Sequence, residues 1–218
     1  EVKHTMKTFN KTLIAAATLT TFGLAAAPAA VALDASASVA TSYLWRGLDL
    51  GSGTPAVSAD VSTSSGGFTA GVWVSSGDTA AGTEYDLYAS YGGEIGGLGY
   101  SVGIARYNYP TGGFDPAVAG FEGTDLTDHI FSLSYGGVTA TVYDLDEDGT
   151  DYKYNTVAFD LGSVGVLYGD HDGDAEMSHV DLSYGVTEEL TFTVSKIVSS
   201  AFASETDATV VASYTLPF

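Results

Sequence analysis

Apolar and polar residues alternate along almost the whole chain after residue 33. A period of two is that of a β-strand whose two faces meet different surroundings, and no segment keeps the period of an amphipathic helix. In one clear case, the residues of one face are Leu98, Tyr100, Val102 and Ile104, and those of the other are Gly99, Ser101, Gly103 and Ala105. The pattern predicts about twelve strands, at residues 35–46, 54–64, 68–76, 84–92, 98–109, 127–135, 138–144, 152–161, 164–170, 177–184, 190–198 and 207–218.

The connections between these segments alternate in length. The odd ones are longer and polar or acidic, whereas the even ones are tight and contain glycine, which supplies the positive φ of a short hairpin turn. An even number of strands of this length, with short turns at one end and long loops at the other, is typical of outer-membrane barrels. The fold class that we expect is therefore all-β: a transmembrane antiparallel up-and-down β-barrel with short periplasmic turns and longer acidic extracellular loops.

The end of the chain supports a closed barrel. Residues 210–218 alternate and finish in Phe218, which is similar to the signal by which the barrel assembly machinery recognises its substrates, and closure removes an edge that would otherwise aggregate. The alternative is a soluble β-sandwich. Its water-exposed face would carry Lys and Glu, whereas the polar face here is built from Ser, Thr, Gly and Ala, which suits a confined lumen.

The first residues have the composition of a secretory leader. Lys7 and Lys11 precede a short apolar run, and Ala30-Val31-Ala32 is a cleavage motif. We expect residues 1–32 to be a leader and cleavable signal peptide that starts at Met6, and residues 33–218 to be the barrel. The alternative is a transmembrane anchor, which would need about 20 continuous apolar residues, and the apolar run here is shorter. The predicted location is the outer membrane of a Gram-negative bacterium, with its lipid and lipopolysaccharide as partners.

Composition excludes several classes of function. The formal net charge of −20 argues against nucleic acid as a partner, and the absence of Cys excludes thiolate chemistry. Aromatic residues near the predicted strand ends suggest interfacial girdles. The tyrosines expected there are Tyr43, Tyr91, Tyr107, Tyr109, Tyr135, Tyr184 and Tyr214.

A series of short motifs carries a family resemblance. They are Tyr43-Leu44-Trp45-Arg46-Gly47, Pro55-Ala56-Val57, Gly71-Val72-Trp73, Glu84-Tyr85-Asp86-Leu87-Tyr88, Gly93-Glu94-Ile95-Gly96-Gly97 and Tyr107-Asn108-Tyr109-Pro110. In order and spacing they resemble the TorF-type porins, a bacterial outer-membrane family that includes Gcw-type proteins, from about residue 43 to 218. The resemblance implies a small barrel with a channel role and brings no catalytic residues. The chain departs from the family in the acidic loops of its second half.

Two acidic segments are candidate cation sites. Asp144, Asp146 and Asp148 precede a glycine as in the opening of a Ca²⁺ loop, and Asp170, Asp172 and Asp174 form a shorter version. These outer loops are candidate sites for Ca²⁺ or Mg²⁺, which could also bridge to lipopolysaccharide. The alternative is a solvated acidic hairpin loop.

The histidines offer little support for catalysis. A His beside a Ser could activate a nucleophile for acyl transfer, but His129 and Ser132 fall on opposite faces. His179 and Ser183 share a face at a separation of about 13 Å. We therefore expect no enzyme and no cofactor beyond a divalent cation, with a lipid hydrolase as the disfavoured alternative.

Five charged residues have the parity of the polar face. They are Arg46, Asp60, Asp86, Asp160 and Asp181. Arg46 is expected at the rim, at the top of the first strand beside Trp45, rather than as a filter. An excess of carboxylates favours cations, so the function that we expect is a porin-like channel for passive diffusion of small solutes with a cation bias. The alternative is a non-conducting structural barrel whose acidic loops bind divalent cations or lipopolysaccharide. The oligomeric state is left open.

Overall fold

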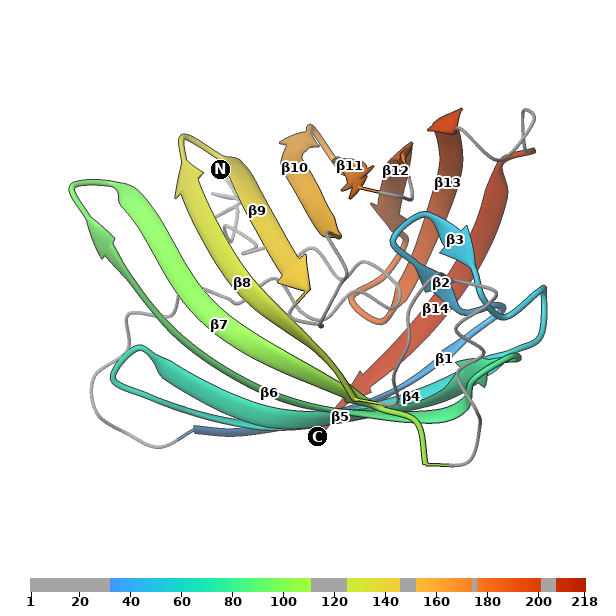
Figure 1. Cartoon of the computed structure of the whole chain (residues 1–218), viewed down its shortest axis with the longest axis horizontal. Coiled ribbons are helices and arrows are strands. Elements are labelled where there is room, and N and C mark those ends of the chain that lie inside the picture. The colour runs from blue at the N-terminus through green and yellow to red at the C-terminus, as the bar shows by residue number, and fades with distance from the viewer. Residues whose placement is uncertain (1–31, 111–124, 146–151, 174–175, 201–206) are drawn as a thin grey trace, which may run out of the picture.

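The chain folds into a closed antiparallel barrel of twelve strands with one small two-stranded hairpin (Figure 1). A computed structural model describes residues 32–110, 125–145, 152–173, 176–200 and 207–218. The barrel strands are β1 (Ala32–Ala40), β4 (Ala56–Ser65), β5 (Phe68–Asp78), β6 (Gly82–Ile95), β7 (Leu98–Asn108), β8 (Asp125–Tyr135), β9 (Val138–Leu145), β10 (Lys153–Leu161), β11 (Val164–Asp172), β12 (Met177–Gly185), β13 (Leu190–Ser200) and β14 (Thr209–Pro217). The hairpin strands are β2 (Leu44–Trp45) and β3 (Leu48–Asp49). The predicted fold class is confirmed. Of the predicted leader, residues 1–31 lie outside the described part of the chain.

Each barrel strand pairs with its neighbours in sequence, and β1 closes the ring by pairing with both β14 and β4. Val39 of β1, for example, is opposite Tyr214 on one side and Val57 on the other. Beyond β14, the backbone N–H of Phe218 donates to the carbonyl of Ala35 over 2.8 Å. The final strand therefore has no open edge, as its alternation predicted.

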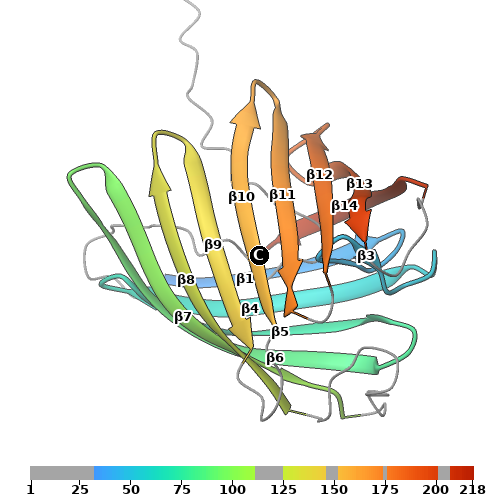
Figure 2. The same ribbon diagram turned by 45° about the horizontal axis from the view of Figure 1, so that its top comes forward.

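The tight glycine turns that the sequence predicted lie together at one end of the barrel (Figure 2), whereas at the other end the connection between β5 and β6, residues 79–81, is shorter than expected. The turn between β4 and β5 is formed by Gly66 and Gly67, whose φ angles are 59° and 86°. Two positive φ values define the type I′ turn that fits the twist of paired strands and favours glycine. Gly96-Gly97 and Gly136-Gly137 repeat this geometry. We call this end the short-turn end and the opposite one the loop end.

The apolar face of the sheet is its outside. Val102 and Phe131 are 49% and 47% exposed, whereas Ser101 and Ala105 on the inner face are 4% and 0% exposed. A soluble barrel would show the reverse, with apolar residues inside. Strands such as β5, β7 and β13, each of 11 residues, have the length that crosses a hydrocarbon layer when tilted. In the described part of the chain, no helix is long and apolar enough to span a membrane.

The expected tyrosine girdles form only at the short-turn end. Tyr91, Tyr135, Tyr184 and Tyr214 lie exposed on the outer face there. Tyr43 and Tyr107 are instead buried, and Tyr109 packs partly buried beside them. The prediction was wrong for these three because their positions in the strands and hairpin direct the rings into the barrel.

The first predicted strand, residues 35–46, was also too long. Strand β1 ends at Ala40, and the chain then folds inward as the β2–β3 hairpin. Arg46 and Gly47 form its turn with φ angles of 47° and 83°, again the geometry of type I′. Ser42 fixes the base of the hairpin, because its hydroxyl donates to the Asp49 carboxylate and accepts from the backbone N–H of Gly53.

Candidate functional site

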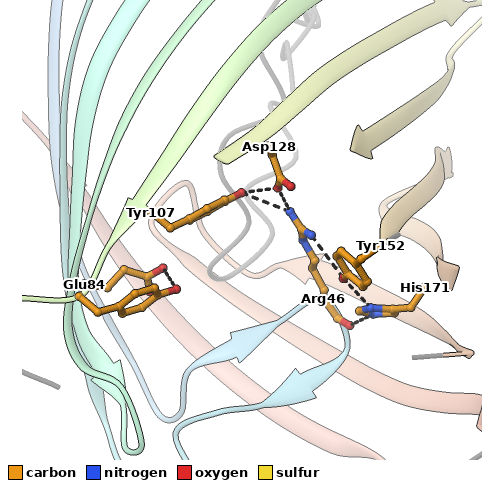
Figure 3. Close-up of polar contacts among 7 residues, drawn as sticks. Arg46, Glu84, Tyr107, Asp128, Tyr152 and His171 are labelled. Atoms are coloured by element: carbon orange, nitrogen blue, oxygen red, sulfur yellow. Dashed lines mark hydrogen bonds and ion pairs between the residues drawn. The ribbon is translucent and has the colours of Figure 1, made fainter. Parts of the chain in front are cut away.

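The candidate site is the interior of the barrel at the tip of the β2–β3 hairpin (Figure 3). Arg46 occupies this tip and is 6% exposed. One guanidinium nitrogen, Nη2, contacts the carboxylate Oδ2 of Asp128 on β8 and donates to the hydroxyl of Tyr107 on β7 over 3.2 Å. The Tyr107 hydroxyl donates to the same Asp128 oxygen over 2.6 Å. The ion pair between Arg46 and Asp128 thus anchors the hairpin to the barrel wall.

Aromatic rings surround the same guanidinium. Its central carbon lies 4.6 Å from the ring centroid of Trp45 and 4.8 Å from the centroids of Tyr143 and Tyr154. Tyr152 lies at 5.9 Å and its hydroxyl accepts from Nη1 over 3.4 Å. Separations within about 6 Å are favourable for a cation above an aromatic ring. We call Trp45, Tyr143, Tyr152 and Tyr154, together with Asp128, the arginine cage.

Electrostatics keep Arg46 charged in this setting. Burial is the largest single effect and opposes its charge, but Asp128, Tyr107 and Tyr152 together outweigh it and raise the pKa of the guanidinium well above its ordinary value. The left-handed φ of Arg46 costs about 1 kcal/mol for a residue with a side chain. Asn or Asp would suit this turn position better, so the arginine is held there by its contacts.

His171 on β11 fixes the backbone of the hairpin tip. Its ring Nε2 lies 2.8 Å from the carbonyl oxygen of Arg46, which can only accept, so Nε2 carries the proton. In the neutral ring Nδ1 then accepts from the Tyr152 hydroxyl over 2.7 Å. The cage therefore holds both the side chain and the main chain of Arg46.

A second histidine lies beneath the hairpin. His179 on β12 is 0% exposed; its Nδ1 lies 2.9 Å from the Asp181 carboxylate and its Nε2 lies 2.9 Å from the Tyr154 hydroxyl. Two glycines make room for the ring, because a Cβ at Gly47 or Gly169 would overlap it. The Asp181 carboxylate accepts from Nδ1, so Nε2 of a neutral ring accepts from Tyr154. This chain of hydrogen bonds supports one wall of the arginine cage.

The part of the interior formed by β6 and β8 is acidic. Glu84 and Asp86 on β6 are 2% and 1% exposed, and Asp128 is 0% exposed. The Glu84 carboxylate accepts from the hydroxyls of Tyr43 at 2.7 Å and Tyr109 at 2.8 Å. Among the described residues, Oδ1 of Asp86 and Oδ1 of Asp128 are buried without a hydrogen-bond partner. Buried carboxylate oxygens without a donor are costly, so these atoms mark a place suited to a cation.

The five residues expected at the lumen or rim are distributed along the interior. Arg46 lies inside the barrel on the hairpin rather than at the top of a strand. Asp86 and Asp181 are buried, and Asp60 is half-buried, where it accepts from the Tyr88 hydroxyl over 2.8 Å. Asp160 is exposed near the short-turn end.

The predicted cation loops are only partly described. Asp146, Asp148 and Asp174 lie outside the described residues. Asp144 forms an ion pair of 3.0 Å with Lys153, Asp170 accepts from the Tyr168 hydroxyl, and Asp172 accepts from the N–H of Gly173. Within the described ranges, no three His, Asp or Glu side chains converge as metal ligands.

Several residues of the site were not predicted from the sequence. Strand parity places Glu84 with Asp86, and Asp128 with Ser132, on the inner face. The same rule puts His179 and Asp181 on one face, two residues apart. The signal was therefore present for these carboxylates and for the His179–Asp181 pair. Parity also directs the cage tyrosines inward, since Tyr143 shares a face with Thr141, and Tyr152 and Tyr154 share one with Thr156. No local signal shows that these rings meet around Arg46.

Fold and site together define an outer-membrane-type β-barrel with an inward hairpin held by a buried arginine. The chain belongs to the family described as "Bacterial protein of unknown function (Gcw_chp)", whose model matches residues 24–215. No curated protein matches the chain.

Among solved structures, the chain is similar to outer membrane phospholipase A from Escherichia coli, with 13% identity, a TM-score of 0.43, and coverage of 84% of this chain and 88% of that one. It is also similar to the Salmonella typhi outer membrane phospholipase dimer with bound calcium, with 12% identity, a TM-score of 0.41, and coverage of 84% and 89%. Likeness at this level carries no argument about activity.

Proposed function

We propose that the protein is a porin-like channel in the outer membrane of a Gram-negative bacterium, through which small cations diffuse passively. The apolar outer face suits lipid and the inner face is polar. In the described ranges, Arg46 is the only buried lysine or arginine, whereas five carboxylates are buried, those of Asp78, Glu84, Asp86, Asp128 and Asp181. This excess of buried carboxylates is the observation that carries the proposal, because it favours cations over anions.

The β2–β3 hairpin is the gate in this proposal. It is anchored by hydrogen bonds to β7, β8 and β11 and to Tyr152 beside β10, so it occupies the interior at the loop end. Conduction then requires the hairpin to break these hydrogen bonds and move out of the interior. The channel role agrees with the one implied by the resemblance to TorF-type porins.

Planar bilayer recording tests the channel. The purified protein is reconstituted in a salt gradient, and the reversal potential is measured with wild-type protein and with Arg46→Ala, which loses the anchor. We expect cation-selective steps that are rarer in wild type than in the variant. Anion selectivity in both proteins, or silence in both, would contradict the proposal.

The second candidate function is a non-conducting surface barrel. The many contacts of the hairpin tip favour it, because a permanent plug needs no release. In that case the acidic outer loops would bind Ca²⁺ or Mg²⁺ and lipopolysaccharide. A correctly folded Arg46→Ala barrel that stays silent, while Ca²⁺ binds to the wild-type protein, would support this candidate instead.

We propose no hydrolytic role. The hydroxyl that contacts His179 belongs to Tyr154, and the Ser183 hydroxyl lies 3.0 Å from that of Thr193. An acyl hydrolase needs a serine or similar nucleophile within hydrogen-bond reach of its base. Release of fatty acid from phospholipid vesicles, lost in His179→Ala, would contradict this.

A further inference from the structure

The arginine cage is built as a receptor for a planar cation, and Arg46 is its occupant from the same chain. We propose that the cage takes the guanidinium group of a small solute in place of Arg46, and that this exchange releases the hairpin. The proposal rests on the proposed channel function and names the solute class that opens it. The Asp128 carboxylate and the three cage tyrosines supply the chemistry, because they do not belong to the hairpin and stay in place when it leaves with Trp45.

A free guanidinium can satisfy the cage better than Arg46 does. Arg46 reaches Asp128 through Nη2 and Oδ2 alone, and Oδ1 of Asp128 has no partner among the described residues. A guanidinium and a carboxylate prefer two parallel hydrogen bonds that use both oxygens. Arg46 is tethered to a turn with a left-handed φ of 47°, which limits its approach. An untethered solute has no such limit.

The surrounding charge favours a second cation on its way to the cage. Asp86 is opposite Tyr107 in the sheet register, and Tyr107 donates to Asp128. Asp86 and Asp128 thus flank the same tyrosine, each with a buried oxygen that lacks a donor within the described chain. Arg46 can neutralise one of these carboxylates, so a cationic solute meets an attractive field before it meets the guanidinium that it displaces.

The hairpin has the geometry to move once Arg46 is displaced. Its two strands contribute only the pairs Leu44–Asp49 and Trp45–Leu48, and neither strand joins the barrel sheet. Gly47 and Gly53 have φ angles of 83° and 75°, which glycine adopts readily. Release of the hairpin therefore breaks no hydrogen bond between barrel strands; it does break the hydrogen bond from His171 to the Arg46 carbonyl.

Binding to the detergent-solubilised full-length protein tests the site apart from conduction. Methylguanidinium chloride at millimolar concentration, far below denaturing levels, is titrated against wild type and Arg46→Ala by calorimetry at constant ionic strength. Removal of the tethered competitor should strengthen binding about tenfold or more, because an occupied cage lowers apparent affinity in proportion to its free fraction. Arg46→Ala/Asp128→Asn should bind no methylguanidinium, and Arg106→Ala, which changes an exposed arginine on the outer face, should match wild type.

Fluorescence monitors displacement of the hairpin in a protein that keeps Arg46. This measurement tests the proposal even if Arg46→Ala fails to fold. The chain has two tryptophans, Trp45 in the cage and Trp73. In Trp73→Phe, the remaining Trp45 should show a saturable red shift with methylguanidinium as the hairpin leaves the cage. The shift should be absent when Asp128→Asn is added.

The outcomes separate this inference from the channel proposal. Absence of binding to folded Arg46→Ala, or of any shift from Trp45, overturns the site even if the protein conducts. Methylammonium that binds as tightly as methylguanidinium overturns the guanidinium assignment. Tight binding to a barrel that never conducts supports the site and contradicts only the channel.

Discussion

Arg46 and Asp128 are 82 residues apart in the chain and form a buried ion pair inside the barrel. One comes from the turn of an inward hairpin and the other from the wall strand β8. The pair therefore joins the only described element outside the barrel sheet to the sheet itself. Together with the hydrogen bond from His171 to the Arg46 carbonyl, this pair holds the hairpin tip inside the barrel, which makes it the first target for substitution.

We predict that Asp128→Asn destabilises the protein by about 3 kcal/mol, because it leaves a buried guanidinium without its counter-charge. Urea unfolding of the refolded barrel in detergent measures this. Asp160→Asn, which changes an exposed carboxylate on the same parity, is the matched control and should leave the midpoint unchanged. In a double-mutant cycle with Arg46→Ala, a coupling of about 2 kcal/mol is expected. A coupling near zero would show that the pair does not hold the hairpin.

We predict that Gly47→Ala opens the interior. Its φ of 83° is costly for alanine, and the new Cβ would overlap the ring of His179, so the hairpin tip cannot keep its position. The expected readout is more frequent conductance steps, or faster protease cleavage of the hairpin if the barrel is silent. Gly53→Ala is the control, because its φ of 75° is similar but its Cβ would meet nothing within 4 Å. Equal effects of the two variants would contradict the argument.

We predict that Tyr154→Phe costs about 1–3 kcal/mol, since it leaves the buried Nε2 of His179 without its donor. The same unfolding measurement applies. Tyr168→Phe removes a hydroxyl that donates to Asp170 on the exposed surface, and its effect should stay within about 0.5 kcal/mol. If both variants unfold at the wild-type midpoint, the hydrogen-bond chain through His179 does not support the cage.

The barrel could be predicted from sequence because its signals are local. The alternation over 98–105 shows its two faces directly, and Gly66-Gly67 specifies its own turn. Strand boundaries at the loop end were less accurate, since β5 continues to Asp78 beyond the predicted residue 76, and β6 begins at Gly82 before the predicted residue 84. Each of these features is determined by residues that are close together in the sequence.

The hairpin and its cage could not be predicted in the same way. Residues 35–46 alternate well enough to read as one strand, and β2 and β3 have only two residues each. What turns the chain inward is contact with Tyr107, Asp128, Tyr152 and His171, which belong to other parts of the barrel. Arg-Gly as a two-residue turn was the available local signal, but arginine is not a residue that such a turn favours.

We predict that Asp86→Asn stabilises the barrel and weakens its cation selectivity together. The Oδ1 atom of Asp86 is buried with no donor in the described residues, so its charge opposes folding while it attracts cations. A neutral amide of the same shape removes both effects, and a gain of about 1 kcal/mol in unfolding free energy is expected. The reversal potential in a salt gradient should move toward zero at the same time.

Asp160→Asn, at an exposed position, should change neither quantity. A variant that gains stability with unchanged selectivity would show that Asp86 is not on the path of the ions, whereas lost stability would show that its carboxylate has a stabilising role.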